Sequence, residues 1–481
     1  MGQSLFHYVL SLVPDLAWPF IEALAKIGFV LGVSLLFFAP VFVLFERRQS
    51  AMVQDRVGPM QGGIKLPRVI IDNIPSLQLG ALGVAVLCSI MTVVCLIQLW
   101  IGNGDSALFT EPLFGVRHTW NGLLFVFALL APVHFVMWFI LPELFTHDRL
   151  TIFGGLHALF DAVKAFTKRD FVPPAGDKLL FALAPMLAMF PAFALGAVLP
   201  FGPTLNLDHL LEQAPPGGFA DGVAVHLQVA SLDMGILYMF AIGGMGIIGA
   251  ALAGYASDNK FSLLGGLRAA SQMVSYEVTL GLALVACFVI YGTLRLENMV
   301  QYQADHAWGI FYPPLTLAYI LFQTASIAEY KRVPFDAPEG ESEIVAGYFL
   351  EYASGKWLMY MIGEFLEVGT SSMLIAVIFF GGWDVPFLQD GGWEFFGERF
   401  DLLGTNFSIL SEVLNSHLVV TIVRVVAFLA KAFLLGVLSI QIRWTLPRFR
   451  YDQIMSLCWK LILPLSLANV LIAGIWVLAF E

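Results

Sequence analysis

Long apolar runs constrain the fold of this chain more than any other feature of its sequence. Each run except the shortest approaches or exceeds the ~20 residues that a helix needs to cross ~30 Å of hydrocarbon. A chain inside a bilayer must satisfy its own backbone hydrogen bonds, which favours helices, and the alternating pattern of a membrane β-barrel is absent. The sequence therefore predicts an all-α, polytopic membrane protein with about ten transmembrane helices. The runs lie near 23–45, 80–101, 121–141, 179–199, 228–254, 272–292, 313–328, 357–380, 418–440 and 459–480.

The composition agrees with a membrane protein and excludes several other classes. Of the 481 residues 58% are hydrophobic and 13% are charged, and the mean hydropathy is +0.80. The net charge of −11 argues against a nucleic-acid partner. The cysteines have no CxxC spacing, so we expect packing residues rather than a disulfide framework, a zinc site or an iron–sulfur site, and no metal site is predicted. They are Cys88, Cys95, Cys287 and Cys458.

Lysine and arginine predict the orientation of the crossings. The loops on one side carry 19 basic residues and those on the other side carry three. Because basic residues gather in cytoplasmic loops, the first set is expected to be cytoplasmic, and ten crossings then leave both termini outside. The predicted cytoplasmic loops are 46–79, 142–178, 255–270, 329–356 and 441–460.

The cytoplasmic loop 329–356 is rich in acids. Pro338 suits the first turn of a helix, where acids are favoured by the partial positive charge of the N-terminus. Glu343, Gly347 and Glu351 are spaced at i, i+4 and i+8, which predicts one acidic helix face. An acid-capped, solvated helix start would explain the first acids, whereas the aromatic neighbours and Glu351 favour a functional cluster.

Ionisable residues also occur inside the apolar runs. Each costs roughly 2.5–3.5 kcal/mol at a helix centre, so such residues usually have a function. Near the membrane ends they can instead extend to the interface without one. The candidates are Glu277, Glu364, Glu367, Arg424 and Lys431.

The segment 153–169 is predicted to be an amphipathic helix that lies at the membrane surface. One face is apolar, with Leu156, Leu159, Phe160, Val163 and Phe166. The other is polar, with His157, Asp161, Lys164 and Lys168.

Several stretches resemble the H subunit of bacterial respiratory complex I, the counterpart of mitochondrial NADH dehydrogenase subunit 1. "FERRQSAMVQDRVGP" at 45–59 is similar to one family signature and "EYKRVPFDAPEGESEIVAGYFLEY" at 329–352 to another. "IRWTLPRFRYDQIMSLCWKLILPLSL" at 442–467 is similar to the C-terminal segment of the family. The resemblance covers roughly 20–60 and 153–481.

The chain departs from the family mainly by one inserted block. The resemblance implies eight transmembrane helices, to which residues 61–153 add a predicted hairpin of two more. We therefore expect an N-terminal segment with the first crossing at 1–60, the hairpin at 61–153, and a segment 154–481 with the surface helix and seven crossings. Lys331 replaces the usual Asn or His, and Ala337 is a further small change.

The resemblance implies a membrane subunit of a proton-translocating NADH:quinone oxidoreductase. In this family a long-tailed quinone enters from the bilayer through a passage in the subunit and is reduced near the last iron–sulfur cluster of partner subunits. Flavin and clusters are then expected on partners, with quinone as substrate and no catalytic residue or covalent cofactor on this chain. The implied passage residues are Glu46, Arg47, Asp161, Lys164, Arg332 and Asp336. The implied proton relay comprises Glu277, Glu339, Glu341, Glu343, Glu351 and Glu364, with Lys431 as a counter-charge.

The family also implies partners and a location. We expect peripheral-arm subunits at the quinone site, small membrane subunits, antiporter-like subunits and lipid as partners. The location would be the bacterial inner membrane, with multiple crossings and periplasmic termini. Two alternatives stay open: the homologous membrane subunit of an energy-converting hydrogenase or other-donor dehydrogenase, and a secondary transporter. The absence of an inverted repeat argues against a transporter.

Overall fold

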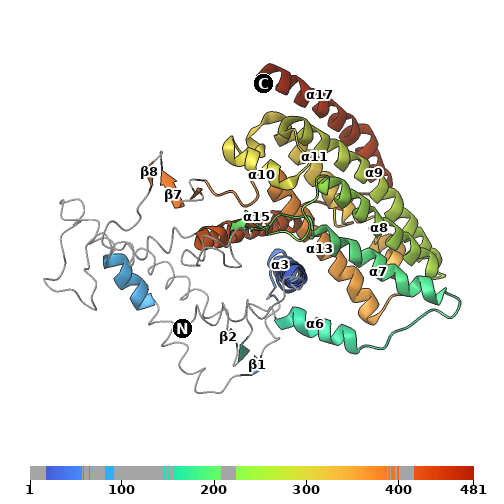
Figure 1. Ribbon diagram of the computed structural model, residues 1–481. Helices are drawn as coiled ribbons and strands as arrows, with labels where there is room; N and C mark the ends of the chain where they lie inside the picture. The colour runs from blue at the N-terminus through green and yellow to red at the C-terminus, as the bar shows by residue number, and fades with distance from the viewer. Residues whose placement is uncertain are drawn as a thin grey trace. The chain divides into compact units, whose positions relative to one another are not determined.

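The computed structural model shows a chain built mainly from long helices (Figure 1). It describes residues 18–56, 58, 64–65, 82–91, 145–146, 149–150, 156–206, 224–386, 388–389, 392–395, 398–399 and 417–480. The chain divides into two compact units. Unit 1 comprises residues 1–56, 161–385 and 421–481, and unit 2 comprises residues 57–160 and 386–420.

Seven described helical segments are long and apolar enough to cross a membrane. The chain is thus an all-α, multi-pass membrane protein, as predicted. The segments are Glu22–Val53, Lys178–Leu195, Gly235–Ala256, Lys260–Tyr291, Ser354–Phe379, Val419–Thr445 and Tyr451–Phe480.

The predicted run 313–328 forms α11 (Pro313–Glu329), which has 17 residues. Within the run 80–101 the structure describes a helix over Leu82–Met91. The run 121–141 and Cys95 lie outside the described residues. The total of ten crossings therefore stays a prediction.

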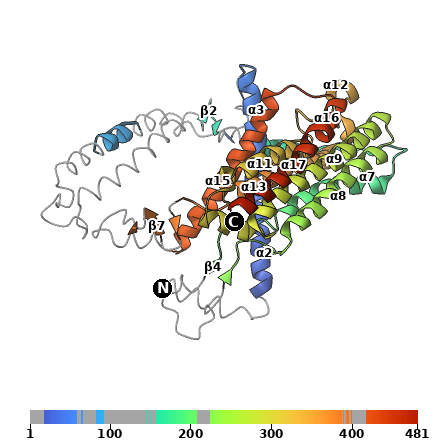
Figure 2. The same cartoon turned by 90° about the horizontal axis from the view of Figure 1, so that it is seen from above.

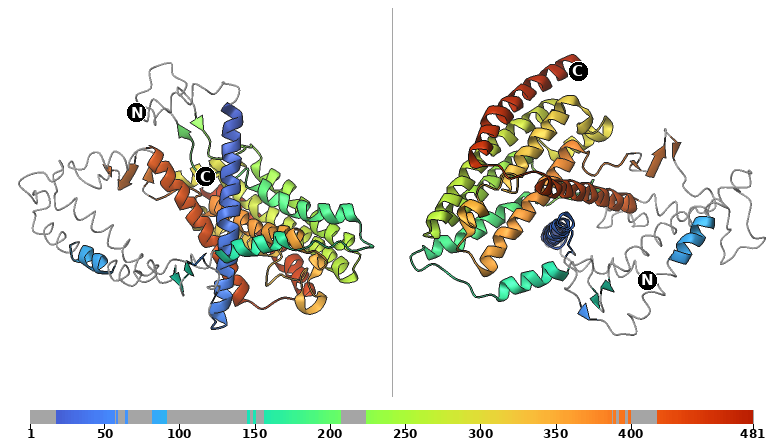
Figure 3. Two further views of the ribbon diagram at one scale, coloured as in Figure 1. Left: turned by 90° about the horizontal axis from the view of Figure 1, so that it is seen from below. Right: turned by 180° about the vertical axis from the view of Figure 1, so that it is seen from behind.

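The first crossing is made of α2 (Trp18–Leu31), η1 (Gly32–Phe38) and α3 (Ala39–Val53). Its two ends, α3 and α2, are visible in Figure 2, and the left view of Figure 3 shows the whole segment as one continuous rod. The amphipathic segment forms α6 (Leu156–Thr167), which runs across the direction of this rod in the left view of Figure 3. Leu159, Phe160, Val163 and Phe166 of α6 are exposed, as expected for a helix that lies on a membrane.

The remaining helices of unit 1 pack side by side (Figure 1). Contacts join α7 to α8, α8 to α9, and α9 to both α11 and α17, while α13 packs against α7. Small residues allow this close approach, because a Cβ on Gly249 of α8 would lie 2.6 Å from the backbone of Ala188 on α7. The bounds are α7 (Lys178–Leu195), α8 (Gly235–Ala256), α9 (Lys260–Tyr291), α10 (Leu296–Asp305), η4 (Gly309–Phe311), α13 (Ser354–Phe379), α15 (His417–Thr445), α16 (Tyr451–Leu457), η7 (Cys458–Ile462) and α17 (Leu463–Phe480).

Polar caps set where two of these helices begin. The Asp177 carboxylate accepts from the backbone N–H of Leu179 at 3.0 Å at the start of α7, and Asn259 accepts from that of Phe261 at 3.0 Å at the start of α9. Such caps satisfy N–H groups that have no partner inside the helix. Because α9 begins at Lys260, much of the predicted loop 255–270 is helical.

The described strands are short and form three small sheets. In unit 2, β1 (Ile64–Lys65) and β2 (Phe145–Thr146) both pair antiparallel with β3 (Arg149–Leu150). Unit 2 also holds β6 (Leu388–Gln389), β7 (Gly392–Phe395) and β8 (Glu398–Arg399), and unit 1 holds β4 (Leu205–Asn206) and β5 (Ala224–Val225).

The acidic helix predicted after Pro338 does not form as one element. The chain makes α12 (Glu341–Ile344) and η5 (Gly347–Phe349) instead. Val345 has φ +66° and Gly347 has φ +59°, which a right-handed helix cannot continue through. The predicted i, i+4, i+8 face is therefore wrong. Glu343 instead pairs with Arg268 of α9, and Glu351 with Asn259, which caps α9.

Candidate functional site

Glu46 joins three segments of unit 1 through its carboxylate. It lies on α3 and forms ion pairs with Arg332, in the loop after α11, and with Arg443 near the end of α15. The guanidinium of Arg332 also lies 3.6 Å from the carboxylate of Glu364 and 4.0 Å from the ring centroid of Phe365, both on α13. Arg332 thus connects the first crossing to the interior of α13.

Asp336 is buried in the same loop and pairs with Arg448, whose Nη2 lies 2.6 Å from its Oδ2. Burial raises the pKa of Asp336 to about 6, although the Arg448 guanidinium lowers it in part. Loss of solvent disfavours the charged carboxylate, and a nearby cation favours it. Asp336 therefore titrates close to physiological pH, unlike an exposed aspartate.

Glu339 and Glu364 form a pair of neighbouring acids. The pKa of Glu339 is raised well above its ordinary value, mainly by burial and secondly by the nearby carboxyl group of Glu364. Glu364 is itself buried on α13 and accepts a hydrogen bond from the Tyr348 hydroxyl at 3.2 Å. The protonated form of Glu339 is therefore favoured beside Glu364.

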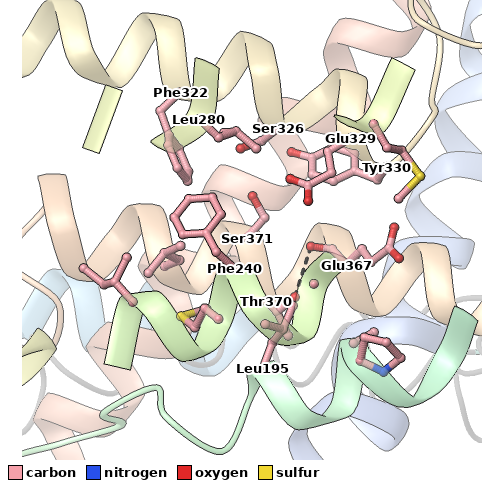
Figure 4. A pocket seen from close by; sticks show the side chains of 17 residues that line it. Leu195, Phe240, Leu280, Phe322, Ser326, Glu329, Tyr330, Glu367, Thr370 and Ser371 are labelled. Atoms are coloured by element: carbon pink, nitrogen blue, oxygen red, sulfur yellow. Dashed lines mark hydrogen bonds between the residues drawn. The ribbon is translucent and has the colours of Figure 1, made fainter. Parts of the chain in front are cut away.

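A cavity of about 80 Å³ lies between α7, α8, α9, α11 and α13. Its lining includes Glu329, at the end of α11, and Glu367 on α13. Figure 4 shows these two acids at one end of the cavity and the rings of Phe240 and Phe322 at the other. Glu277, on α9, acts electrostatically on Glu329. The cavity thus has an acidic end and an apolar end.

Lys331 lies among these acids and is buried. Its Nζ is 3.9 Å from Oε2 of Glu367 and 5.8 Å from the ring centroid of Tyr348. Glu364, Glu339 and Glu329 also act on it electrostatically. Together the carboxyl groups of this region form an acid cluster, which comprises Glu277, Glu329, Glu339, Glu364 and Glu367.

Other predicted relay acids lie at the edge of this region and face α9. Glu343 is half-exposed and accepts a hydrogen bond from Arg268 at 2.8 Å. Glu351 accepts one from the side chain of Asn259 at 2.7 Å. The side chain of Glu341 lies outside the described residues.

Lys431 has no contact with the acid cluster among the described residues. Its Nζ donates to the backbone carbonyl oxygens of Phe380, Gly382 and Asp384 at 2.8, 3.1 and 2.5 Å. It also lies 4.2 Å from the ring centroid of Trp308. The lysine therefore stabilises the carbonyl end of α13, where a cation is favoured.

A cleft of about 430 Å³ includes three of the predicted passage residues. Arg47 of α3 pairs with Asp161 of α6 at 2.5 Å, and Lys164 lines the same cleft. Trp357, near the start of α13, lines it as well. The structure thus brings Arg47, Asp161 and Lys164 together, while Glu46, Asp336 and Arg332 lie in the ion-paired region around the loop after α11.

The sequence-based site omitted several residues that contribute to this arrangement. Glu329 ends an apolar run, Glu367 was predicted only as an ionisable candidate, and Lys331 was noted only as a departure from the family. Arg443 and Arg448 come from the C-terminal signature and pair with predicted site acids. The excess of acids around Asp336 could have indicated that distant cations must balance them.

The described part of the chain contains no group of three or more His, Cys, Asp or Glu residues placed to hold a metal ion. Cys88, Cys287 and Cys458 are all buried. The Cys458 thiol donates to the backbone carbonyl of Ser275 at 3.3 Å, which agrees with a packing role.

Comparison with known proteins assigns the family. The profile described as NADH dehydrogenase matches residues 146–474. The chain belongs to this family. A relative from Cytophaga hutchinsonii, named as an H subunit of NADH-quinone oxidoreductase, is 37% identical over 69% of this chain and 86% of its own length. An H subunit of the same enzyme from Geobacter sulfurreducens is 38% identical over 67% of this chain and 82% of its own length. The resemblance found in the signatures is thus confirmed.

Proposed function

We propose that the chain is the membrane subunit of a proton-translocating NADH:quinone oxidoreductase, and that it links a quinone passage to a proton route. The observation that carries this proposal is the series of buried and partly buried charged side chains from Glu46, through Arg332 and Glu364, to the cavity acids. Such groups are costly inside a membrane protein without a function. The names of the relatives support quinone as substrate.

The quinone passage begins, in this proposal, at the cleft lined by Arg47, Asp161 and Lys164. The exposed apolar face of α6 supports an opening at the membrane surface, because a long apolar tail would leave the bilayer there. Glu46, Arg332 and Asp336 then border the inner part. The chain provides shape and charge, while flavin and iron–sulfur clusters on partner subunits carry the electrons.

The proton route begins where the passage ends. Quinone reduction takes up protons and changes charge, and coupled acids convert that change into proton movement. Glu339, which favours its protonated form, lies next to Glu364, the partner of Arg332. Glu367, Glu329 and Glu277 continue the route into the bundle. The cavity is large and polar enough at its acidic end to hold water that would join these carboxyl groups.

The other relay candidates have supporting roles in the proposal. Glu343 and Glu351 contact the start of α9 and hold the acidic loop on it. Glu341 belongs to the same loop. Lys431 serves as a fixed counter-charge at the far end of α13.

The proposed setting is a bacterial inner membrane with both termini periplasmic. The partners are the peripheral-arm subunits of the quinone site, small membrane subunits and antiporter-like subunits, besides lipid. Because the electron carriers belong to these partners, the isolated chain should lack NADH-dependent quinone reduction.

Residues 61–153 form, in this proposal, a membrane hairpin between segments 1–60 and 154–481. Support comes from the small sheet of unit 2, in which β1 and β2 are both joined to β3. This sheet brings Lys65 and Thr146 to the same register position against Arg149, as expected if the chain leaves and returns on one side. Cysteines at Lys65 and Thr146 should be labelled only from the cytoplasm, and one at Ser106 only from outside. Labelling of the first two from opposite sides would exclude the hairpin.

A photoreactive long-tailed quinone analogue tests the proposed function directly. In the assembled complex the analogue should label peptides of α3, α6 or the loop after α11, and excess unmodified quinone should remove the label. A matched control is an analogue with the same tail but no quinone headgroup. Labelling that quinone does not compete away would favour a homologous subunit that serves another electron acceptor.

A further inference from the structure

Lys331 occupies an unusual position for a lysine. It is 5% exposed and has φ +58°, in the left-handed region that is unfavourable for a residue with a long side chain. Asparagine and glycine adopt this conformation at lower cost. A residue held in a strained and buried place is a candidate for function.

Glutamate side chains act on Lys331 from α11, from α13 and from the loop between them. Glu367 and Glu364 face it from α13, Glu329 from the end of α11, and Glu339 from the loop. Tyr348 of η5 covers it with its ring. Burial lowers the pKa of Lys331, but these carboxyl groups raise it by more, and the net shift is upward. The ammonium group is therefore charged throughout the physiological range.

A second cation, Arg332, forms ion pairs with other acids than Lys331 does. It pairs with Glu46 outside the acid cluster, and within the cluster its ion pair is with Glu364. Lys331 forms its ion pair with Glu367, which lines the cavity. Of the two adjacent cations, Arg332 therefore pairs with the acids toward Glu46, and Lys331 pairs with an acid of the cavity.

We propose that Lys331 is the resident counter-cation of the acid cluster and sets how many protons the cluster holds at neutral pH. A buried cation favours ionised carboxylates around it, so its removal makes the cluster keep protons to higher pH. Lys331 is a positioning residue in this sense, since it tunes the acids that would pass protons. The inference rests on the proposed function only for its consequence in coupling, and not for the protonation itself.

The test compares variants of Lys331 in the assembled complex. Lys331→Asn removes the charge but suits the left-handed backbone, so the substitution adds no backbone strain of its own. Lys331→Arg keeps the charge. Lys356→Asn is the matched control, because Lys356 pairs at 2.8 Å with Asp170, outside the acid cluster.

The first readout is infrared absorption of protonated carboxyl groups as a function of pH. In Lys331→Asn the titration should move to higher pH by about one to two units, while Lys331→Arg and Lys356→Asn should titrate like the wild type. The double variant Lys331→Asn/Glu367→Gln removes one charge of each sign and should move the midpoint back. A wild-type titration in Lys331→Asn would overturn the proposal.

The second readout separates this inference from the proposed function. If the titration moves and the pH profile of proton translocation moves with it, both are supported. If the titration moves and translocation does not, Lys331 is still the counter-cation, but the cluster is not the coupling route. If Lys331→Asn fails to assemble and the double variant assembles, charge balance is the cause and the inference is supported. Failure of both would leave Lys331 with a structural role and overturn it.

Discussion

The hydroxyl of Tyr348 donates a hydrogen bond to Oε1 of Glu364 across 3.2 Å. Both residues are buried, and they join η5 of the acidic loop to the interior of α13. The bond positions the carboxyl group that lies between Arg332 and the remaining acids. The hydrogen bond therefore connects the acidic loop to the Glu364 carboxyl group on α13.

Tyr348→Phe should weaken this connection without creating a cavity. We expect the free energy of unfolding to fall by about 1 kcal/mol, and the rate of proton translocation to fall more than the rate of quinone reduction. Thermal unfolding of the purified complex and paired rate measurements check this. Tyr255→Phe is a suitable control, because Tyr255 is 67% exposed. An equal ratio of proton translocation to quinone reduction in Tyr348→Phe and Tyr255→Phe would contradict the role given to the hydrogen bond.

Arg448→Met should change the pH dependence of activity. The pKa of Asp336 is about 6 with the Arg448 guanidinium beside it. Removing a cation disfavours the carboxylate, so this pKa should rise further, and the acidic limb of the activity profile should move to higher pH by about one unit or more. Arg448→Lys keeps the charge and should move the limb less. An unchanged limb in Arg448→Met would mean that Asp336 does not control it.

Gly265→Ala should displace the acidic loop from α9. A Cβ at this position would lie 2.6 Å from the backbone nitrogen of Tyr348, and backbone cannot yield as a flexible side chain does. We expect a loss of about 1–3 kcal/mol, as for overpacked sites, measured as a lower unfolding temperature. Gly281→Ala on the same helix is the control, because its Cβ would have no neighbour within 4 Å. Equal unfolding temperatures for the two variants would show that η5 is not held tightly there.

Much of the fold could be predicted because membrane crossings leave a strong local signal. A run such as 357–380 must be helical for backbone reasons alone, and α13 covers nearly all of it. The acidic loop was mispredicted because i, i+4 spacing takes no account of backbone conformation. Val345 at φ +66° breaks the helix, and a valine in the sequence does not predict a left-handed backbone.

The acids of the site could be predicted from their cost in a membrane, but their partners could not. Glu46 and Arg443 are 397 residues apart in the sequence, and only the packing of α3 against the end of α15 brings them together. Glu329 was missed because it ends an apolar run. Lys431 was found by its cost as well, yet its contacts are backbone carbonyls, which no sequence pattern specifies.

The most direct test of the account is the number of protons translocated per quinone reduced, measured in proteoliposomes with Glu364→Gln in the assembled complex. Because positioned side chains typically accelerate proton transfer by 10²–10⁴-fold, we expect proton transfer to slow about tenfold or more, so that fewer protons are translocated for each quinone reduced. Glu277→Gln should behave likewise. Glu343→Gln should impair coupling less, since its half-exposed ion pair with Arg268 contributes little. Wild-type proton translocation per quinone in an assembled Glu364→Gln complex would contradict the claim that these acids couple quinone reduction to proton movement.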